Sequence, residues 1–154
     1  RGTALRRLED GAAWASYYEP GHWKAWAQFS PNGRWLAYTD IPEQHRPEVT
    51  VESIPAGGSH WHISKKGGDW PIWRGDGKEI FYAEANQIMA VPVTENGAFV
   101  TVGEARKLFE VRYVLPRFQV SRDGKRFLLA IPQDSIVDQT ALTVDTDWRA
   151  RTIR

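Results

Sequence analysis

The feature that most constrains this chain is a ten-residue pattern that occurs three times. Each copy, at 29–38, 73–82 and 120–129, places an Asn-Gly or Asp-Gly pair between two apolar segments. The glycines of the three pairs, at positions 33, 77 and 124, are 44 and 47 residues apart. A fixed period of this kind indicates repeated supersecondary units that stack on one another, because a single unit cannot bury its apolar face alone.

The chemistry of each copy predicts a tight β-hairpin. Glycine enters the left-handed φ region without a Cβ clash, and Asn or Asp can bond to the nearby backbone. Pro31 suits the second position of the first turn, because its ring already fixes φ. The segments that follow the turns, 35–38, 80–83 and 127–131, are almost entirely apolar. Such runs predict strands that are covered on both faces.

Further strands complete each unit. The alternation of apolar and polar residues over 48–54 predicts a strand nearer the rim, with one wetter face. In the later units, the strands that correspond to 48–54 are predicted at 87–93 and 142–148. A fourth strand is predicted at 60–64 in the first unit and at either 99–102 or 107–111 in the second. Helical periodicity is weak throughout the chain, so the predicted fold class is all-β.

The period of the repeat is close to the length of one four-stranded blade of a β-propeller. We therefore predict a partial β-propeller of about three antiparallel blades, forming a single domain over 1–154. The predicted blades are 25–66, 67–111 and 112–154. The segment 1–24 is expected to be a leading outer strand or to close the ring.

Three blades leave two blade faces uncovered, since a closed propeller has at least about four blades. An uncovered face exposes more apolar surface than soluble monomers usually tolerate. Two ways of covering the faces stay open: this chain is part of a longer protein, or two copies associate to complete the ring. The start at Arg1 instead of methionine favours a processed or excised chain.

The repeated sequence resembles the PD40 repeat of TolB-like β-propellers, whose core reads Trp/Phe-Ser-Pro-Asp-Gly-Lys before a short apolar strand. Segment 29–38 is the nearest copy, and the order of the units is similar to the propeller found C-terminal to some bacterial serine/threonine kinases. The resemblance extends over 26–148. The departures from the pattern are Asn32, Arg74-Gly75 and Arg122.

This resemblance implies a binding or scaffold module within a larger bacterial signalling or envelope protein. It also implies a protein or peptide partner and a periplasmic or extracellular location. It implies no shared catalytic set.

Composition argues against several classes of protein. With 20 Lys and Arg against 19 Asp and Glu, the formal net charge is +1, so no overall field favours nucleic acid. The absence of cysteine excludes a disulfide framework, a thiolate metal site and a cysteine nucleophile. No apolar run is long enough for a membrane helix, and we predict no membrane insertion by this segment.

No catalytic residue, metal or cofactor is predicted. No serine lies in a Gly-x-Ser-x-Gly elbow, and the kinase motifs are missing from these residues. His60 and His62 stand at i and i+2 of one predicted strand, a spacing that suits a metal only with a third ligand. We expect instead two exposed histidines on either side of a core-facing Trp61.

Most of the eight tryptophans are expected to fill the core, and Trp35 and Trp73 in particular are predicted to pack between blades. A second group lies just before the first two turn motifs, where strands would enter near the mouth of a propeller channel. This group is the predicted ligand-binding site: His22, Trp23, Trp26, Asp69 and Trp70.

The function predicted from these observations is recognition of a protein, peptide or small ligand by a non-catalytic module. The alternative is a propeller enzyme, or the accessory domain of a peptidase, glycosidase or lyase, with a polar channel site. Asp, Glu and His side chains converging in one pocket would favour the alternative.

Overall fold

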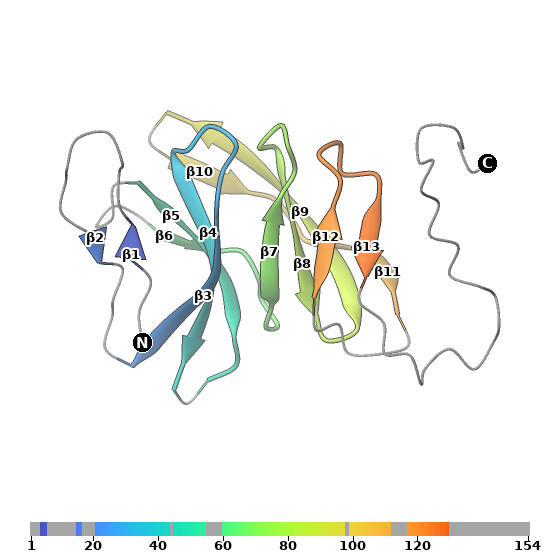
Figure 1. The fold of residues 1–154 in the computed structure, drawn as a ribbon, viewed down its shortest axis with the longest axis horizontal. Helices are drawn as coiled ribbons and strands as arrows, with labels where there is room; N and C mark the ends of the chain where they lie inside the picture. Colours follow the sequence, from blue (N-terminus) through green and yellow to red (C-terminus); the bar gives the residue numbers. More distant parts are fainter. Residues whose placement is uncertain are drawn as a thin grey trace.

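The computed structural model describes residues 4–5, 15–16, 21–43, 45–54, 60–97, 99–111 and 117–129. These residues form strands, turns and loops, which confirms the predicted all-β class. The strands make several antiparallel sheets, none of which closes on itself within this part of the chain (Figure 1). Nothing in the same residues forms a helix of the length and apolar character needed to cross a membrane.

The first unit is a four-stranded antiparallel meander, in which each strand pairs with the next one in sequence. Its strands are β3 (His22–Phe29), β4 (Trp35–Pro42), β5 (Glu48–Ser53) and β6 (His60–His62). The first six residues of β4 are all buried, as its apolar run predicted. Strand β3 begins at His22, inside the predicted leading segment.

Strand β5 corrects one prediction, because neither of its faces is wet. Thr50 and Glu52, the polar residues of the alternating pattern, are both buried. Each has a polar partner in the same sheet: the Thr50 hydroxyl lies 3.3 Å from His62 Nδ1 on the adjacent β6, and Lys24 Nζ, from β3 on the far side of β4, donates to Glu52 at 3.1 Å. Polar residues in an alternating pattern can therefore face a covered surface when hydrogen bonds offset their desolvation.

The second unit has the same topology, with its fourth strand in two parts. Its strands are β7 (Asp69–Trp73), β8 (Glu79–Glu84), β9 (Gln87–Asn96), β10 (Phe99–Val102) and β11 (Arg106–Glu110). Both β10 and β11 pair antiparallel with the long β9, so both predicted alternatives for the fourth strand are present. Between them, a Cβ at Gly103 would lie 2.6 Å from Cγ of Pro92, so this interruption requires glycine.

The third unit is described only as the hairpin of β12 (Phe118–Val120) and β13 (Phe127–Leu129). The prediction that its second strand is covered on both faces is wrong for the described part, since Leu128 is 69% exposed. Phe127 packs on the second unit, whereas Leu128 points to the opposite face of the hairpin, where no described sheet lies. The predicted strand 142–148 lies outside the described residues.

Near the start of the chain, β1 (Ala4–Leu5) pairs antiparallel with β2 (Ala15–Ser16).

The three turns of the repeat have the same conformation, as the hairpin prediction requires. The glycines Gly33, Gly77 and Gly124 have φ of 71°, 72° and 74°. Each N–H donates to the carbonyl three residues earlier, at 2.8, 2.9 and 2.8 Å. In every turn the preceding Asn or Asp accepts a backbone N–H two residues on, at 3.1 Å, and these side chains are Asn32, Asp76 and Asp123.

The units stack sideways through two apolar clusters (Figure 1). Between the first and second units, Trp35, Val51 and Ile63 meet Trp73, Tyr82 and Val91 among others. Between the second and third units, Phe127 lies edge-on to Phe81 at 5.3 Å. Trp35 and Trp73 are 2% and 7% exposed, which confirms that both pack between units.

The second turn has Arg74 and Gly75 where the first turn has Ser30 and Pro31, and the third turn has Arg122 in the place of that proline. Arg74 lies in the Ser position and binds both Asp76 at 2.7 Å and the buried Glu79 at 2.9 Å. Gly75 N–H donates to the Arg122 carbonyl at 2.9 Å, and a Cβ at Gly75 would lie 2.7 Å from that oxygen. The second and third turns therefore touch directly, and glycine replaces proline where they do.

The substitution Ala85→Gly is expected to stabilise the fold. Ala85 is the first residue of the two-residue β8–β9 turn and has a φ of 54°, which costs less for glycine than for alanine. We expect urea denaturation to show a gain of about 0.5–1 kcal/mol in unfolding free energy. Ala105→Gly, where φ is not positive, serves as the control and should lower stability; equal effects of the two changes would contradict the prediction.

The turn carboxylate of Asp76 should make stability depend on pH. The hydrogen bond from the Arg74 side chain, and next that from the Lys78 backbone N–H, hold the pKa of Asp76 below its usual value. The carboxylate therefore stabilises the fold above the ordinary carboxyl pKa, and this contribution is lost as the pH falls through the lowered value. Urea unfolding at several pH values should show Asp76→Asn less stable than the unmodified chain at neutral pH, with a difference that shrinks in acid. A difference that is constant with pH would contradict this.

Candidate functional site

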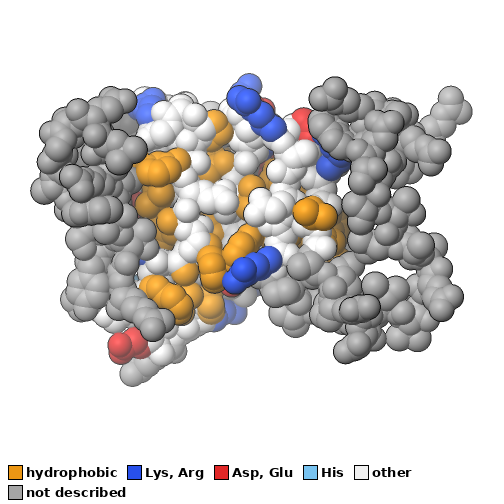
Figure 2. All heavy atoms as spheres, viewed as in Figure 1, with side chains coloured by type: hydrophobic (Ala, Val, Ile, Leu, Met, Phe, Trp, Pro, Cys, Tyr) orange, Lys and Arg blue, Asp and Glu red, His pale blue; other side chains and the backbone are white. Residues whose placement is uncertain are grey.

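The first strands of the three units lie next to one another on one side of the molecule. In Figure 1, β3, β7 and β12 stand side by side in front of the later strands, and β7 contacts both of the others. Each pairs with a single strand in the described part of the chain, so its other edge is unpaired there. We call this surface the first-strand face; Figure 2 shows exposed hydrophobic side chains on it, over β3 and β7.

Two tryptophans of this face occupy equivalent, unusual backbone positions. Trp26 and Trp70 stand seven residues before Gly33 and Gly77, and their φ values are 54° and 60°. Each lies in a β-bulge, where the pairing register of its strand shifts. The shift in β3 is between Ala25 and Gln28, and the shift in β7 is between Asp69 and Ile72. Left-handed backbone is uncommon for a bulky residue and costs on the order of 1–3 kcal/mol. Bulges of this kind change the direction of a side chain and occur frequently beside functional sites.

The bulges bring the two indoles together beside a cation. The ring centroids of Trp26 and Trp70 are 4.2 Å apart, with 41° between the ring planes. The guanidinium of Arg117 lies 5.4 Å from the first ring and 5.2 Å from the second. We call these three residues the Trp-Trp-Arg cluster.

Arg117 completes a series, since it stands seven residues before Gly124. Each of the three units therefore contributes the residue at one equivalent position to the cluster. The sequence analysis did not single out Arg117, although alignment of the three turns by their glycines places it in line with Trp26 and Trp70.

The cluster is accessible to a ligand and also joins the units. Trp26 is 41% exposed, Trp70 is half-buried and Arg117 is exposed. Trp70 Nε1 donates to the Phe118 carbonyl of β12 at 3.1 Å, which fixes the central indole against the third unit.

Asp69 supports the cluster through one of its two carboxylate oxygens. Its Oδ1 accepts the Trp70 backbone N–H at 2.7 Å and the buried Thr39 hydroxyl at 2.8 Å. The Thr39 oxygen also lies within 3.1 Å of the Trp70 N–H. Asp69 thus holds the bulge of β7 against β4 of the first unit.

The other two predicted ligand residues lie near the start of β3. His22 Nδ1 is 2.9 Å from Asp40 Oδ2, across the β3–β4 pair, and Trp23 is 45% exposed. Among the described residues, no hydrogen bond, ion pair or ring contact joins either of them to the Trp-Trp-Arg cluster. The structure therefore brings together Trp26, Asp69 and Trp70 of the predicted set.

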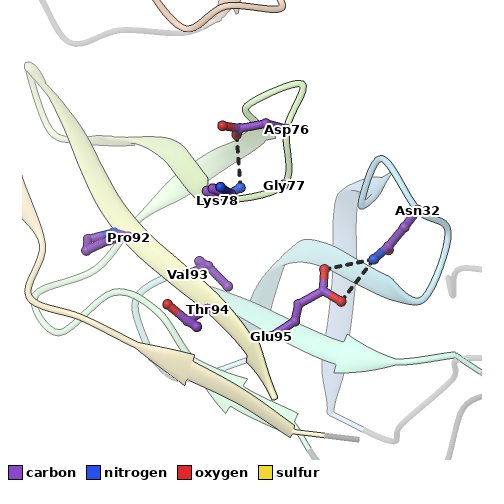
Figure 3. Close-up of a pocket in the computed structure, with 8 residues that line it drawn as sticks. All are labelled: Asn32, Asp76, Gly77, Lys78, Pro92, Val93, Thr94 and Glu95. Atoms are coloured by element: carbon purple, nitrogen blue, oxygen red, sulfur yellow. Dashed lines mark hydrogen bonds between the residues drawn. The ribbon is translucent and has the colours of Figure 1, made fainter. Parts of the chain in front are cut away.

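A separate pocket of about 560 Å³ lies at the turn end, between the first and second units (Figure 3). Its lining is Asn32, Asp76, Gly77, Lys78, Pro92, Val93, Thr94 and Glu95. Asn32 Nδ2 donates to both carboxylate oxygens of Glu95 at 2.9 Å, and the Asp76 carboxylate accepts the Lys78 backbone N–H. Both acidic groups of the pocket are thus engaged in holding the turns.

The histidines of β6 lie as expected. His60 and His62 are exposed with ring centroids 5.7 Å apart, while Trp61 packs on Trp35 at 5.5 Å. Among the described residues, no group of three or more His, Cys, Asp or Glu side chains is arranged to hold a metal ion.

Groups suited to acid–base chemistry are scattered over the described part of the chain. There, His22 and Asp40 are the one histidine–carboxylate pair, and no hydroxyl group bonds to His22. Burial raises the pKa of Tyr82 to about 12, which keeps its hydroxyl protonated at neutral pH. The first-strand face instead offers aromatic surface and a cation, which suit recognition.

No model of a known protein family matches this chain, and no curated protein matches it either.

Proposed function

We propose that this chain is a non-catalytic binding module of the β-propeller type, which recognises a protein or peptide through its first-strand face. The observation that carries the proposal is the pair Trp26 and Trp70, two partly exposed indoles held in left-handed backbone at equivalent positions. Large aromatic residues at a surface are the commonest energetic anchors of protein recognition.

The strain in these positions supports a role beyond packing. Glycine adopts left-handed backbone without a steric cost, and the turn glycines of this fold, with φ of 71° to 74° in the three repeats, do so. Tryptophan at the two bulges therefore costs backbone strain that glycine would avoid. Strained residues of this kind cluster at ligand sites.

The stacked four-stranded units and the resemblance to the PD40 repeat support the propeller part of the proposal. In a propeller, the first strand of each blade is the one nearest the central channel, so the first-strand face would line that channel. The resemblance extends the proposal to a scaffold role in a larger bacterial signalling or envelope protein.

The propeller-enzyme alternative required Asp, Glu and His side chains converging in one pocket. In the described residues, the carboxylates nearest the cluster and the turn pocket are engaged in hydrogen bonds to their own neighbours. We therefore favour binding over catalysis.

The test is selection of peptides from a random display library on the folded chain, followed by affinity measurements with variants. Trp26→Gly removes the indole and suits the left-handed backbone, so we expect it to fold and to weaken binding about 10-fold or more. Phe99→Ala, a change at an aromatic residue that is 63% exposed on β10, is the control and should bind normally. Failure to select any peptide, or equal affinity for Trp26→Gly and the unmodified chain, would refute the proposal.

A further inference from the structure

Arg117 differs from the arginines that pair with acids in this structure. Arg34 lies 3.7 Å from Glu95, and Arg74 and Arg106 both bind Glu79. The guanidinium of Arg117, by contrast, contacts only the two indoles of the cluster among the described residues, with no carboxylate or carbonyl acceptor there. An exposed guanidinium has five N–H donors to offer.

The position of this cation is set before any ligand arrives. Two aromatic rings within 5.4 Å hold the guanidinium by cation–π attraction, which limits the freedom of a long side chain. Binding to an ordered guanidinium costs less conformational entropy than binding to a free one. The cluster is therefore prepared for an anionic group.

The surroundings of Arg117 restrict which anion fits. Asp69, next to Trp70 on β7, accepts two hydrogen bonds at Oδ1, and no ion pair between it and Arg117 is found among the described residues. Trp26 offers a flat apolar surface that is 41% exposed on the same cluster. A single guanidinium pairs bidentately with either a carboxylate or a phosphate, but its one positive charge balances the single charge of a carboxylate and not the charge of about −1.5 to −2 on a phosphate monoester.

We propose that the Trp-Trp-Arg cluster binds a peptide carboxylate that is flanked by an apolar side chain. Arg117 pairs with the carboxylate, and the exposed ring of Trp26 covers the apolar group. The carboxylate comes from a chain terminus or from an acidic side chain, two sources with the same chemistry. This inference rests on the proposed binding function and names the class of ligand.

Calorimetric titration with four short synthetic peptides tests the inference. All four carry an acetylated N-terminus and a C-terminal phenylalanine. The first pair differs only at the C-terminus, which is a free acid in one peptide and an amide in the other. The second pair are both C-terminal amides, and they differ in having Glu or Gln before the phenylalanine. We expect the free acid or the Glu amide to bind about 10-fold or more tightly than its neutral counterpart. The peptide that binds identifies the source of the carboxylate.

Two protein variants separate a specific pair from general charge attraction. Arg117→Gln should abolish the preference for the acidic peptide. Arg122→Gln is the matched control: it removes the same charge from an exposed arginine five residues away and should keep the preference. Circular dichroism and urea unfolding establish that both variants fold.

The outcomes distinguish this inference from the proposed function. A fifth peptide, an amide with phosphoserine before the phenylalanine, is titrated as well. Equal affinity for acid and amide, an equal loss in both variants, or dependence on Arg117 for the phosphoserine peptide alone would overturn the carboxylate inference. If none of the four peptides binds while peptides selected by display still depend on Trp26, the carboxylate inference fails and the proposed function stands.

Discussion

The structure depends on burial of apolar side chains between neighbouring sheets. Trp35, Val51 and their neighbours on the first unit meet Trp73 and Tyr82 on the second, and Phe81 of the second meets Phe127 of the third. Apolar burial is the main favourable term in folding, and here it joins units that are far apart in sequence. Because this stacking aligns equivalent positions, it also creates the first-strand face.

The Trp-Trp-Arg cluster follows from that alignment. Trp26, Trp70 and Arg117 come from three units, yet they lie within ring-contact and cation–π distance because the units repeat with the same turn geometry. The cluster joins the units through the Trp70 indole N–H and at the same time leaves Trp26 and Arg117 accessible. The proposed site is therefore built by the packing of all three units.

Several features of the candidate site were predictable from local patterns. Trp26, Asp69 and Trp70 were selected because they precede the turn motifs, and the structure brings them together. The β3 bulge carries no Gly or Pro signal, and the β7 bulge contains Pro71, which is typical of bulges and edge strands but does not indicate a left-handed residue before it, so no local rule identified the left-handed tryptophans. Arg117 was missed because an isolated arginine has no motif, and its meaning comes from its place in the repeat.

Turn chemistry and apolar runs act over a few residues, so the hairpins, the all-β class and the burial of Trp35 and Trp73 followed from local sequence. Three other features came from the three-dimensional arrangement: β5 has no wet face, β10 and β11 share one strand position, and Leu128 is exposed. The physical reason is that the covering of a strand depends on the sheet beside it, and the neighbours of a sheet are distant in the chain.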